Sequence, residues 1–429
     1  MQMNALKPHR KIDMSHDAER IVTPFYGWYV VLGAFAVTLV GFGSAYTFGA
    51  FIGSLEHDFH ASRGSVSLVF SLAGFLYFGF GIFSGPLADR FGARMLAFLG
   101  MLVTGAGLIL AGLAQSLTGV YAAYSLGIGL GVGLSYVPVL GAVQRWFVRR
   151  RGLASGLAVS GIGIGTLVMP PLATFLVSSI GWRHAYFVLG ILAAVVGGGF
   201  ALLLANDPQE RGQAPDGDAI ADRSERRPAS GVSIRTAVTS RRFIGLYIAC
   251  LIGSFGLFVP FVHLVPFALD HGIAPSTAAL LLGVVGIGST GGRFILGGIA
   301  DKMERLMTIL VMFAGIAGSM VIWILSKNVW TLGLFSLVFG VFYGGYVALL
   351  PAVVMDSFGG KNVSALIGIL YTSVAFGTLI GPSVAGFAFD LTHSYTAPIL
   401  ACALTSLMAV AILALTSRAS IPLHEMETT

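Results

Sequence analysis

GPLADRFGAR (residues 85–94) is the stretch that decides the fold, because part of it returns later in the chain. The related segment GGIADK (residues 297–302) begins 212 positions further on. Other residues repeat at the same offset: Gly156 with Gly368, Gly165 with Gly377, Pro170 with Pro382, and Arg149 with Lys361. Several independent matches at one offset indicate that the chain consists of two duplicated halves.

Long apolar stretches surround these segments. The 429 residues are 56% hydrophobic and only 10% charged, and the mean hydropathy is +0.86. About 20 apolar residues are needed to cross ~30 Å of hydrocarbon as a helix. A β-barrel would instead show alternation within segments of ~10 residues, which is absent. Twelve stretches are long enough, at 26–53, 64–88, 95–115, 118–142, 153–178, 185–205, 243–268, 277–300, 306–326, 329–355, 363–388 and 395–417.

The pattern predicts an all-α membrane protein with twelve transmembrane helices in two pseudo-symmetric six-helix bundles. We expect the first bundle at 26–206 and the second at 243–417. A polar cytoplasmic linker is expected at 207–242, and the cytoplasmic tails at 1–25 and 418–429.

The distribution of positive charge predicts the orientation. Of the 25 lysines and arginines, 21 fall in the termini and in the loops on their side of the membrane. The opposite side has only Arg63, Arg183 and Lys327. Cytoplasmic loops carry the excess of positive charge, so both termini are expected in the cytoplasm, in a cell inner membrane.

Composition also argues against several other classes. Cys250 and Cys402 both fall inside apolar stretches, which is typical of small buried side chains and does not favour a disulfide or a metal cluster. The pI near 9.4 follows from topology, so no nucleic-acid partner is expected. No combination of nucleophile, base and cavity is predicted at membrane depth, so we expect neither an enzyme nor a bound cofactor. Residues 1–25 lack the apolar core of a cleavable signal.

Arg293 is the one lysine or arginine well inside an apolar stretch. A guanidinium keeps its charge, and burying it at membrane depth costs at least ~2.5–3.5 kcal/mol. Such a residue normally faces a cavity and meets an anion. The alternative is an arginine whose side chain reaches the membrane interface. The first interpretation predicts a carrier of small carboxylates.

Three stretches resemble a known family. GPLADRFGAR resembles the signature loop of the major facilitator superfamily, and the resemblance extends over the whole chain. WFVRRRGLASGLAVSG (residues 146–161) and YGWYVVLGAF (residues 26–35) are similar to its monocarboxylate transporter and oxalate/formate antiporter branch. The resemblance implies a secondary transporter that works by alternating access. It also implies that Arg293, in the eighth span, binds the substrate carboxylate.

The chain departs from the branch pattern at three places. Ser289 stands where animal monocarboxylate transporters add an aspartate, and the first span has Tyr46 near the place of their lysine. The oxalate/formate antiporter adds a second cation in the eleventh span, but 363–389 contains none. One fixed positive charge matches one carboxylate, which favours a monocarboxylate similar to lactate or pyruvate. An oxalate/formate-type antiporter, or a sensor that binds carboxylate without moving it, remains the alternative.

Polar and aromatic side chains in the eighth span and in other spans are further candidates for the substrate site. Aromatic bodies enclose a short carbon chain and hydroxyl groups meet its oxygens, although both also serve in helix packing. The candidates beside Arg293 are Ser289, Tyr343, Tyr346, Tyr371, Phe376, Tyr46, Tyr124 and Tyr136.

Coupling and gating residues are less well defined by the sequence. Proton symport needs a titrating group, and His263 and Asp270 are the candidates, whereas exchange needs none. By resemblance, Asp89, Arg90 and Arg94, with Asp301 in the second copy, form a cytoplasmic charge latch. The expected partners are a small carboxylate anion, a proton in the symport case, and the lipid bilayer around a monomer.

Overall fold

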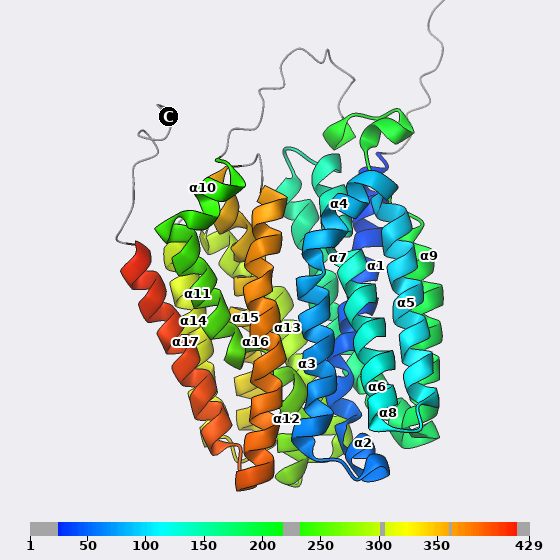
Figure 1. Cartoon of the computed structure of the whole chain (residues 1–429), viewed down its shortest axis with the longest axis vertical. Helices are drawn as coiled ribbons and strands as arrows, with labels where there is room; N and C mark the ends of the chain where they lie inside the picture. The colour runs from blue at the N-terminus through cyan, green and yellow to red at the C-terminus, as the bar shows by residue number, and fades with distance from the viewer. Residues whose placement is uncertain (1–24, 218–231, 301–304, 360–362, 418–429) are drawn as a thin grey trace, which may run out of the picture.

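The computed structural model describes residues 25–217, 232–300, 305–359 and 363–417, and helices dominate these ranges. Figure 1 shows the first half of the chain, in blue to green, beside the second half, in green to red. The helices of the first half are α1 (Gly27–Tyr46), α2 (Ile52–Phe59), α3 (Arg63–Gly79), α4 (Gly81–Phe91), α5 (Ala93–Leu113), α6 (Leu117–Val120), α7 (Leu126–Trp146), α8 (Arg151–Leu192) and α9 (Gly198–Ala201).

The second half begins after the central polar segment. Its helices are α10 (Ile234–Thr239), α11 (Arg241–Leu257), α12 (Val259–Asp270), α13 (Pro275–Ala300), α14 (Arg305–Leu325), α15 (Val329–Phe358), α16 (Val363–Thr392) and α17 (Thr396–Ser417). Short 3-10 and π segments join some of them: η1 (Phe48–Ala50), η2 (Tyr121–Ser125), η3 (Ala193–Gly197), η4 (Pro208–Arg211) and η5 (Pro215–Gly217).

The helices match the predicted apolar stretches. Ten are long and apolar enough to cross a membrane, and α3 with α4 makes an eleventh, bent by 41°. One of the ten runs for 50 residues, from Gly152 to Ala201, which is too long for a single crossing. It breaks at Gly181, whose φ of 79° and ψ of 157° are not helical. The chain is therefore a multi-pass, all-helical membrane protein.

Local sequence explains where several helices begin. The hydroxyl groups of Ser62, Ser116 and Ser240 accept hydrogen bonds from the backbone N–H three residues later, at the starts of α3, α6 and α11. Pro260 stands in the first turn of α12, where its missing N–H costs nothing. Each of α11 and α12 therefore has its own start signal, and the chain breaks between them.

Two helix pairs join the halves of the chain. Helix α3 packs on α16, and α8 packs on α13. Glycine permits the close approach in both: a Cβ on Gly386 would lie 2.7 Å from the Cα of Gly64. In the second pair, a Cβ on Gly163 would collide with Thr290, and one on Gly286 would collide with the backbone of Gly163.

The two ends of the molecule differ. The end with the central segment 207–217 and α10, at the top of Figure 1, is called the linker face. The opposite end carries α2 and the segments 271–274 and 393–395, and is called the α2 face. Charged side chains at the α2 face connect the two halves, as described below.

Candidate functional site

Arg293 lies on α13 with only 5% of its surface exposed. Among the buried residues that the structure describes, Arg293 is the only arginine, lysine, aspartate or glutamate. None of its three guanidinium nitrogens has a hydrogen-bond partner within the described part of the chain. A buried charge without a partner is strongly destabilising, so the guanidinium of Arg293 is suited to bind an anion.

Tyrosines surround this cation. Tyr343, Tyr136, Tyr46 and Tyr371 lie close enough to interact with Arg293 electrostatically. The hydroxyl groups of Tyr46 and Tyr343 are hydrogen-bonded to each other at 2.9 Å, across the boundary between the halves. These rings provide hydroxyl groups of the kind that bind a carboxylate beside a guanidinium.

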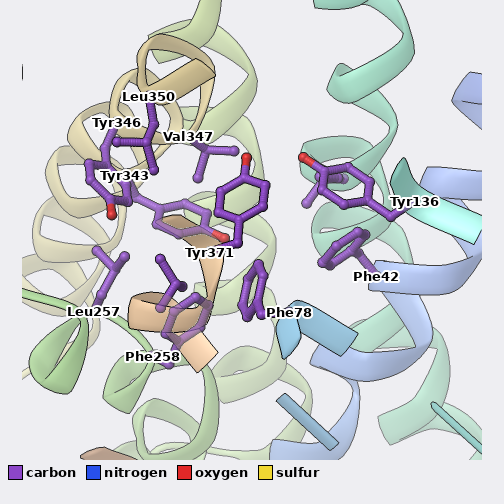
Figure 2. Close-up of a pocket in the computed structure, with 12 residues that line it drawn as sticks. Phe42, Phe78, Tyr136, Leu257, Phe258, Tyr343, Tyr346, Val347, Leu350 and Tyr371 are labelled. Atoms are coloured by element: carbon purple, nitrogen blue, oxygen red, sulfur yellow. The ribbon is translucent and has the colours of Figure 1, made fainter. Parts of the chain in front are cut away.

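A cavity of about 20 Å³ lies between the halves at this level (Figure 2). That volume has room for about one water molecule, but not for an organic acid. Its polar groups are tyrosine hydroxyls and its other walls are apolar. The lining residues are Phe42, Phe78, Tyr136, Ile162, Leu257, Phe258, Tyr343, Tyr346, Val347, Leu350, Tyr371 and Val374.

An aromatic stack closes the cavity on the side of the α2 face. The ring of Phe261, on α12, stacks on Tyr46 with centroids 4.3 Å apart. Phe261 also packs edge-on against Tyr343, at 5.0 Å. A ligand that approached Arg293 from the α2 face would have to displace this stack.

The structure brings most of the predicted site residues together. Tyr343, Tyr346 and Tyr371 line the cavity, and Tyr46 bonds to the first of them. Ser289 is buried one turn before Arg293, and its hydroxyl has no partner among the described residues.

Two predicted residues lie elsewhere. Phe376 is 45% exposed, and its ring packs against Phe75 of α3. The hydroxyl of Tyr124 donates to the carbonyl of Ala45 at 3.0 Å, and its ring packs on Phe48, so neither residue lines the cavity.

Sequence reasoning missed the apolar part of the lining. Phe42, Phe78 and Phe258 line the cavity, but each stands in an apolar helix like many of the 31 phenylalanines. No local pattern separates a cavity-lining phenylalanine from one that faces lipid. Only the packing of the helices identifies them.

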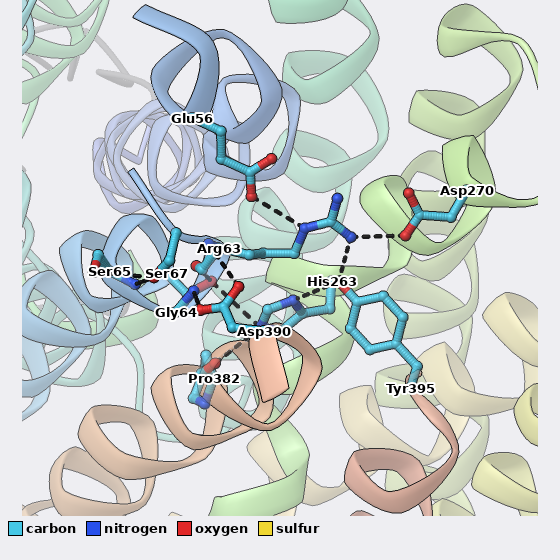
Figure 3. A network of polar contacts seen from close by, with 11 residues as sticks. Glu56, Arg63, Gly64, Ser65, Ser67, His263, Asp270, Pro382, Asp390 and Tyr395 are labelled. Atoms are coloured by element: carbon cyan, nitrogen blue, oxygen red, sulfur yellow. Dashed lines mark hydrogen bonds and ion pairs between the residues drawn. The ribbon is translucent and has the colours of Figure 1, made fainter. Parts of the chain in front are cut away.

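A second polar cluster lies at the α2 face, around Arg63 (Figure 3). Its guanidinium donates to Glu56 at 3.0 Å and to Asp270 at 2.7 Å. It also donates to the hydroxyl of Tyr395 at 3.1 Å. Because Asp270 and Tyr395 belong to the second half, one arginine of the first half ties the two halves together.

Asp390 adds a further link between the halves. Its carboxylate accepts hydrogen bonds from the backbone N–H groups of Arg63, at 3.0 Å, and Gly64, at 2.9 Å. These amides begin α3, where the helix dipole favours a negative charge. The sequence predicts Arg63 only as a residue on the side opposite the termini, and nothing in it pairs Arg63 with Asp390, 327 positions away.

Burial changes the titration of this cluster. Desolvation raises the pKa of Glu56, and Arg63 partly opposes that effect. Burial likewise raises the pKa of Tyr395, so this residue keeps its phenolic proton.

His263 adjoins the cluster through Tyr395 and is fully buried. Its Nε2 atom is 2.8 Å from the backbone carbonyl of Pro382, and its Nδ1 atom is 3.1 Å from the hydroxyl of Tyr395. The two predicted coupling residues therefore contact one network: Asp270 through Arg63, and His263 through Tyr395.

The predicted latch residues lie at the linker face. Arg94 donates to the carbonyl of Leu204 at 2.6 Å, and the Arg90 guanidinium lies over the ring of Phe91. Asp301 and the side chain of Asp89 fall outside the part that the structure describes. The charge latch remains a prediction.

The central segment also docks at the linker face. The carboxylate of Asp216 accepts hydrogen bonds from the backbone N–H groups of Val148, at 2.9 Å, and Arg149, at 2.8 Å. Slight burial opposes the charge of Asp216, but the backbone donors prevail and lower its pKa.

Known proteins are similar to this chain in sequence and in fold. The family profile described as "Major Facilitator Superfamily" matches residues 33–327. Monocarboxylate transporter 11 of Mus musculus is 31% identical over 388 residues, which cover 88% of this chain and 84% of the relative. Monocarboxylate transporter 12-B of Danio rerio is 29% identical over 397 residues, which cover 87% and 83%.

A solved structure supports the fold alone. It is described as a bacterial homolog to the human lysosomal transporter Spinster, in an inward-facing and unoccupied conformation. The TM-score is 0.69 at 16% identity, and the match covers 92% of this chain and 98% of that one.

Proposed function

Since this chain belongs to the Major Facilitator Superfamily and its monocarboxylate transporter branch, we propose that it carries small monocarboxylates similar to lactate or pyruvate. It is a transporter and not an enzyme. Transport proceeds by alternating access, with a proton as the coupled ion. One observation carries the choice of substrate: the buried guanidinium of Arg293 has no partner among the described residues.

The charge of the site limits the substrate. Arg293 is the only fixed charge among the buried described side chains, so a monocarboxylate neutralises it and a dicarboxylate leaves one negative charge buried. The fork of the guanidinium suits a bidentate carboxylate, while Tyr46 and Tyr343 offer hydroxyl groups beside it. Phenylalanine rings of the cavity then enclose the short carbon chain.

The small size of the cavity supports alternating access. The cavity is too small for an acid, so the halves 26–206 and 243–417 must move apart at one face to admit it. We place both termini and the linker face in the cytoplasm of a cell with an inner membrane, and the α2 face outside. Each monomer contains one complete site between its two halves.

Proton coupling requires a group that titrates. His263 and Asp270 are the candidates, and both contact the Arg63 network that closes the α2 face. By its family resemblance, the chain has Ser289 where animal monocarboxylate transporters have an aspartate, so we place the coupling group away from the arginine of α13.

Uptake of labelled acid into proteoliposomes tests the proposal. Arg293→Lys keeps the charge but loses the planar fork, so uptake should fall at least about tenfold, the cost of a charge-assisted hydrogen bond. Arg183→Lys is the matched control, because Arg183 lies at the α2 face and binds the carbonyl of Ala114. Undiminished uptake by Arg293→Lys would contradict the assignment. Competition by oxalate that exceeded competition by lactate would contradict the substrate class.

A further inference from the structure

The hydrogen bonds of His263 have a fixed direction (Figure 3). The carbonyl oxygen of Pro382 can only accept, so Nε2 of His263 carries the proton. In the neutral ring Nδ1 is then an acceptor, and the hydroxyl of Tyr395 donates to it. The oxygen of Tyr395 in turn accepts from the guanidinium of Arg63.

This arrangement suits a neutral His263. A proton on Nδ1 would turn that atom into a donor toward the Tyr395 oxygen, which already receives the N–H of Arg63. The Tyr395 hydroxyl would lose its acceptor. Two positive charges would also lie on either side of one tyrosine, in a region where His263 is fully buried.

We propose that His263 is a proton-binding switch that controls the α2 face: protonation of Nδ1 and docking of Arg63 in the second half exclude each other. A neutral His263 keeps Arg63 docked and the α2 face closed. A proton taken up from the outer solution onto Nδ1 releases Arg63 and favours opening of that face. The inference rests on the proposed function, for which it supplies the pH-sensing group.

Other charged groups set the balance of this switch. Arg63, from α3, repels a positive His263, and Asp390, from α16, attracts it. Glu56 and Asp270 hold the guanidinium of Arg63 and thereby strengthen the closed state. Protonated Asp270 would weaken only one of the three bonds of Arg63, whereas protonated His263 opposes its charge directly.

Helix α12 connects His263 to the cavity. His263 stands two residues after Phe261 on α12, and Phe261 stacks on Tyr46 beside Arg293. A displacement of α12 that follows the release of Arg63 would move this stack as well. Opening of the α2 face and access to Arg293 are therefore coupled through one short helix.

The distance between spin labels across the α2 face measures the switch without any transport. The labels are placed at His57→Cys and Leu391→Cys, because these side chains are exposed and belong to different halves. The buried Cys250 and Cys402 are replaced by alanine in the full-length chain. Lowering the pH from about 7.5 to 5.5 should raise the open population about tenfold, a typical coupling between two sites.

Two variants test the role of His263. The side chain of His263→Gln can still donate to Pro382 and accept from Tyr395 but does not titrate, so the distance should stay short at both pH values. His271→Gln is the matched control, since His271 lies at the end of the same helix and its Nδ1 atom contacts the carbonyl of Phe267, within its own helix. It should respond as the wild type does. A pH response that survived in His263→Gln would overturn the proposal.

A third variant keeps the ring of Tyr395 but removes its hydroxyl, the relay that links Arg63 to His263. Tyr395→Phe should raise the open population at pH 7.5, and an unchanged distance would count against the relay. Counterflow of labelled lactate and pyruvate at equal pH tests the carrier assignment separately. If the distance responds to pH but neither acid exchanges, the switch stands and the proposed substrate class fails.

Discussion

The carboxylate of Asp390 accepts a hydrogen bond from the backbone N–H of Arg63 at 3.0 Å, so a side chain of the second half caps a helix of the first. The cap occupies the positive end of the α3 dipole, and the Arg63 side chain meanwhile binds Asp270. Closure of the α2 face thus uses both the backbone and the side chain of one residue.

Asp390→Asn should loosen this contact without removing a side chain. A neutral amide makes a weaker cap than a carboxylate, by about 1 kcal/mol at a helix N-terminus. Hydrogen exchange at the amides of Arg63 and Gly64 should therefore accelerate about fivefold or more. The amide of Ser65 is the internal reference, because its partner is the hydroxyl of Ser62. Equal protection in the variant would show that the carboxylate does not hold α3.

Arg293→Met should stabilise the protein while abolishing transport. The substitution removes a buried charge that has no partner among the described residues, and it fills the space with an apolar chain. The free energy of unfolding should rise by about 1 kcal/mol or more, seen as a higher Tm in detergent. In Arg183→Met the Tm should fall, since that guanidinium bonds to the carbonyl of Ala114. A lower Tm for Arg293→Met would indicate that the arginine has a partner.

Gly163→Ala should disturb the contact between α8 and α13. The new Cβ would collide with the hydroxyl of Thr290, so the helices must separate. We expect a loss of stability of about 1–3 kcal/mol, together with slower uptake. Gly152→Ala, on the same helix, has no atom within 4 Å of its Cβ and should be neutral or slightly stabilising. Equal Tm values for the two variants would contradict the close approach.

Asp216 should hold the central segment in a pH-dependent way. Its pKa is lowered by the backbone donors, so its contribution is complete above the usual aspartate pKa of about 3.9 and is lost as the pH falls through the lower, folded value. Hydrogen exchange at Val148 and Arg149 should stay slow at pH 5, and at that pH it should become faster in Asp216→Asn. Protection that was unaffected by the asparagine would mean that another group docks this segment.

The sequence predicted the features that depend on composition and local pattern. Apolar length located the spans, and charge singled out Arg293, which the structure buries without a partner among the described residues. Phe376 shows where such reasoning stops. It stands five positions after Tyr371, which at about 100° per residue places the two on different faces of α16. Helical periodicity could separate these faces but could not say which one lines the cavity.

Contacts between the halves were beyond prediction for a related reason. The bond from Arg63 to Asp390 joins residues that neither share an element nor repeat at the duplication offset. A single sequence contains no signal for such a pair. The break at Gly181, in contrast, lies between the predicted spans 153–178 and 185–205.

The two contacts between the halves differ in chemistry, and this has a consequence for how the molecule responds to its surroundings. Both contacts use glycine, but the contact near Arg63 also depends on ions that keep 15–36% of their side-chain surface accessible. Ionic strength weakens ion pairs and leaves glycine packing nearly unchanged. Salt added on the side of the α2 face alone should therefore favour opening of that face, so that the salinity on that side of the membrane would affect transport.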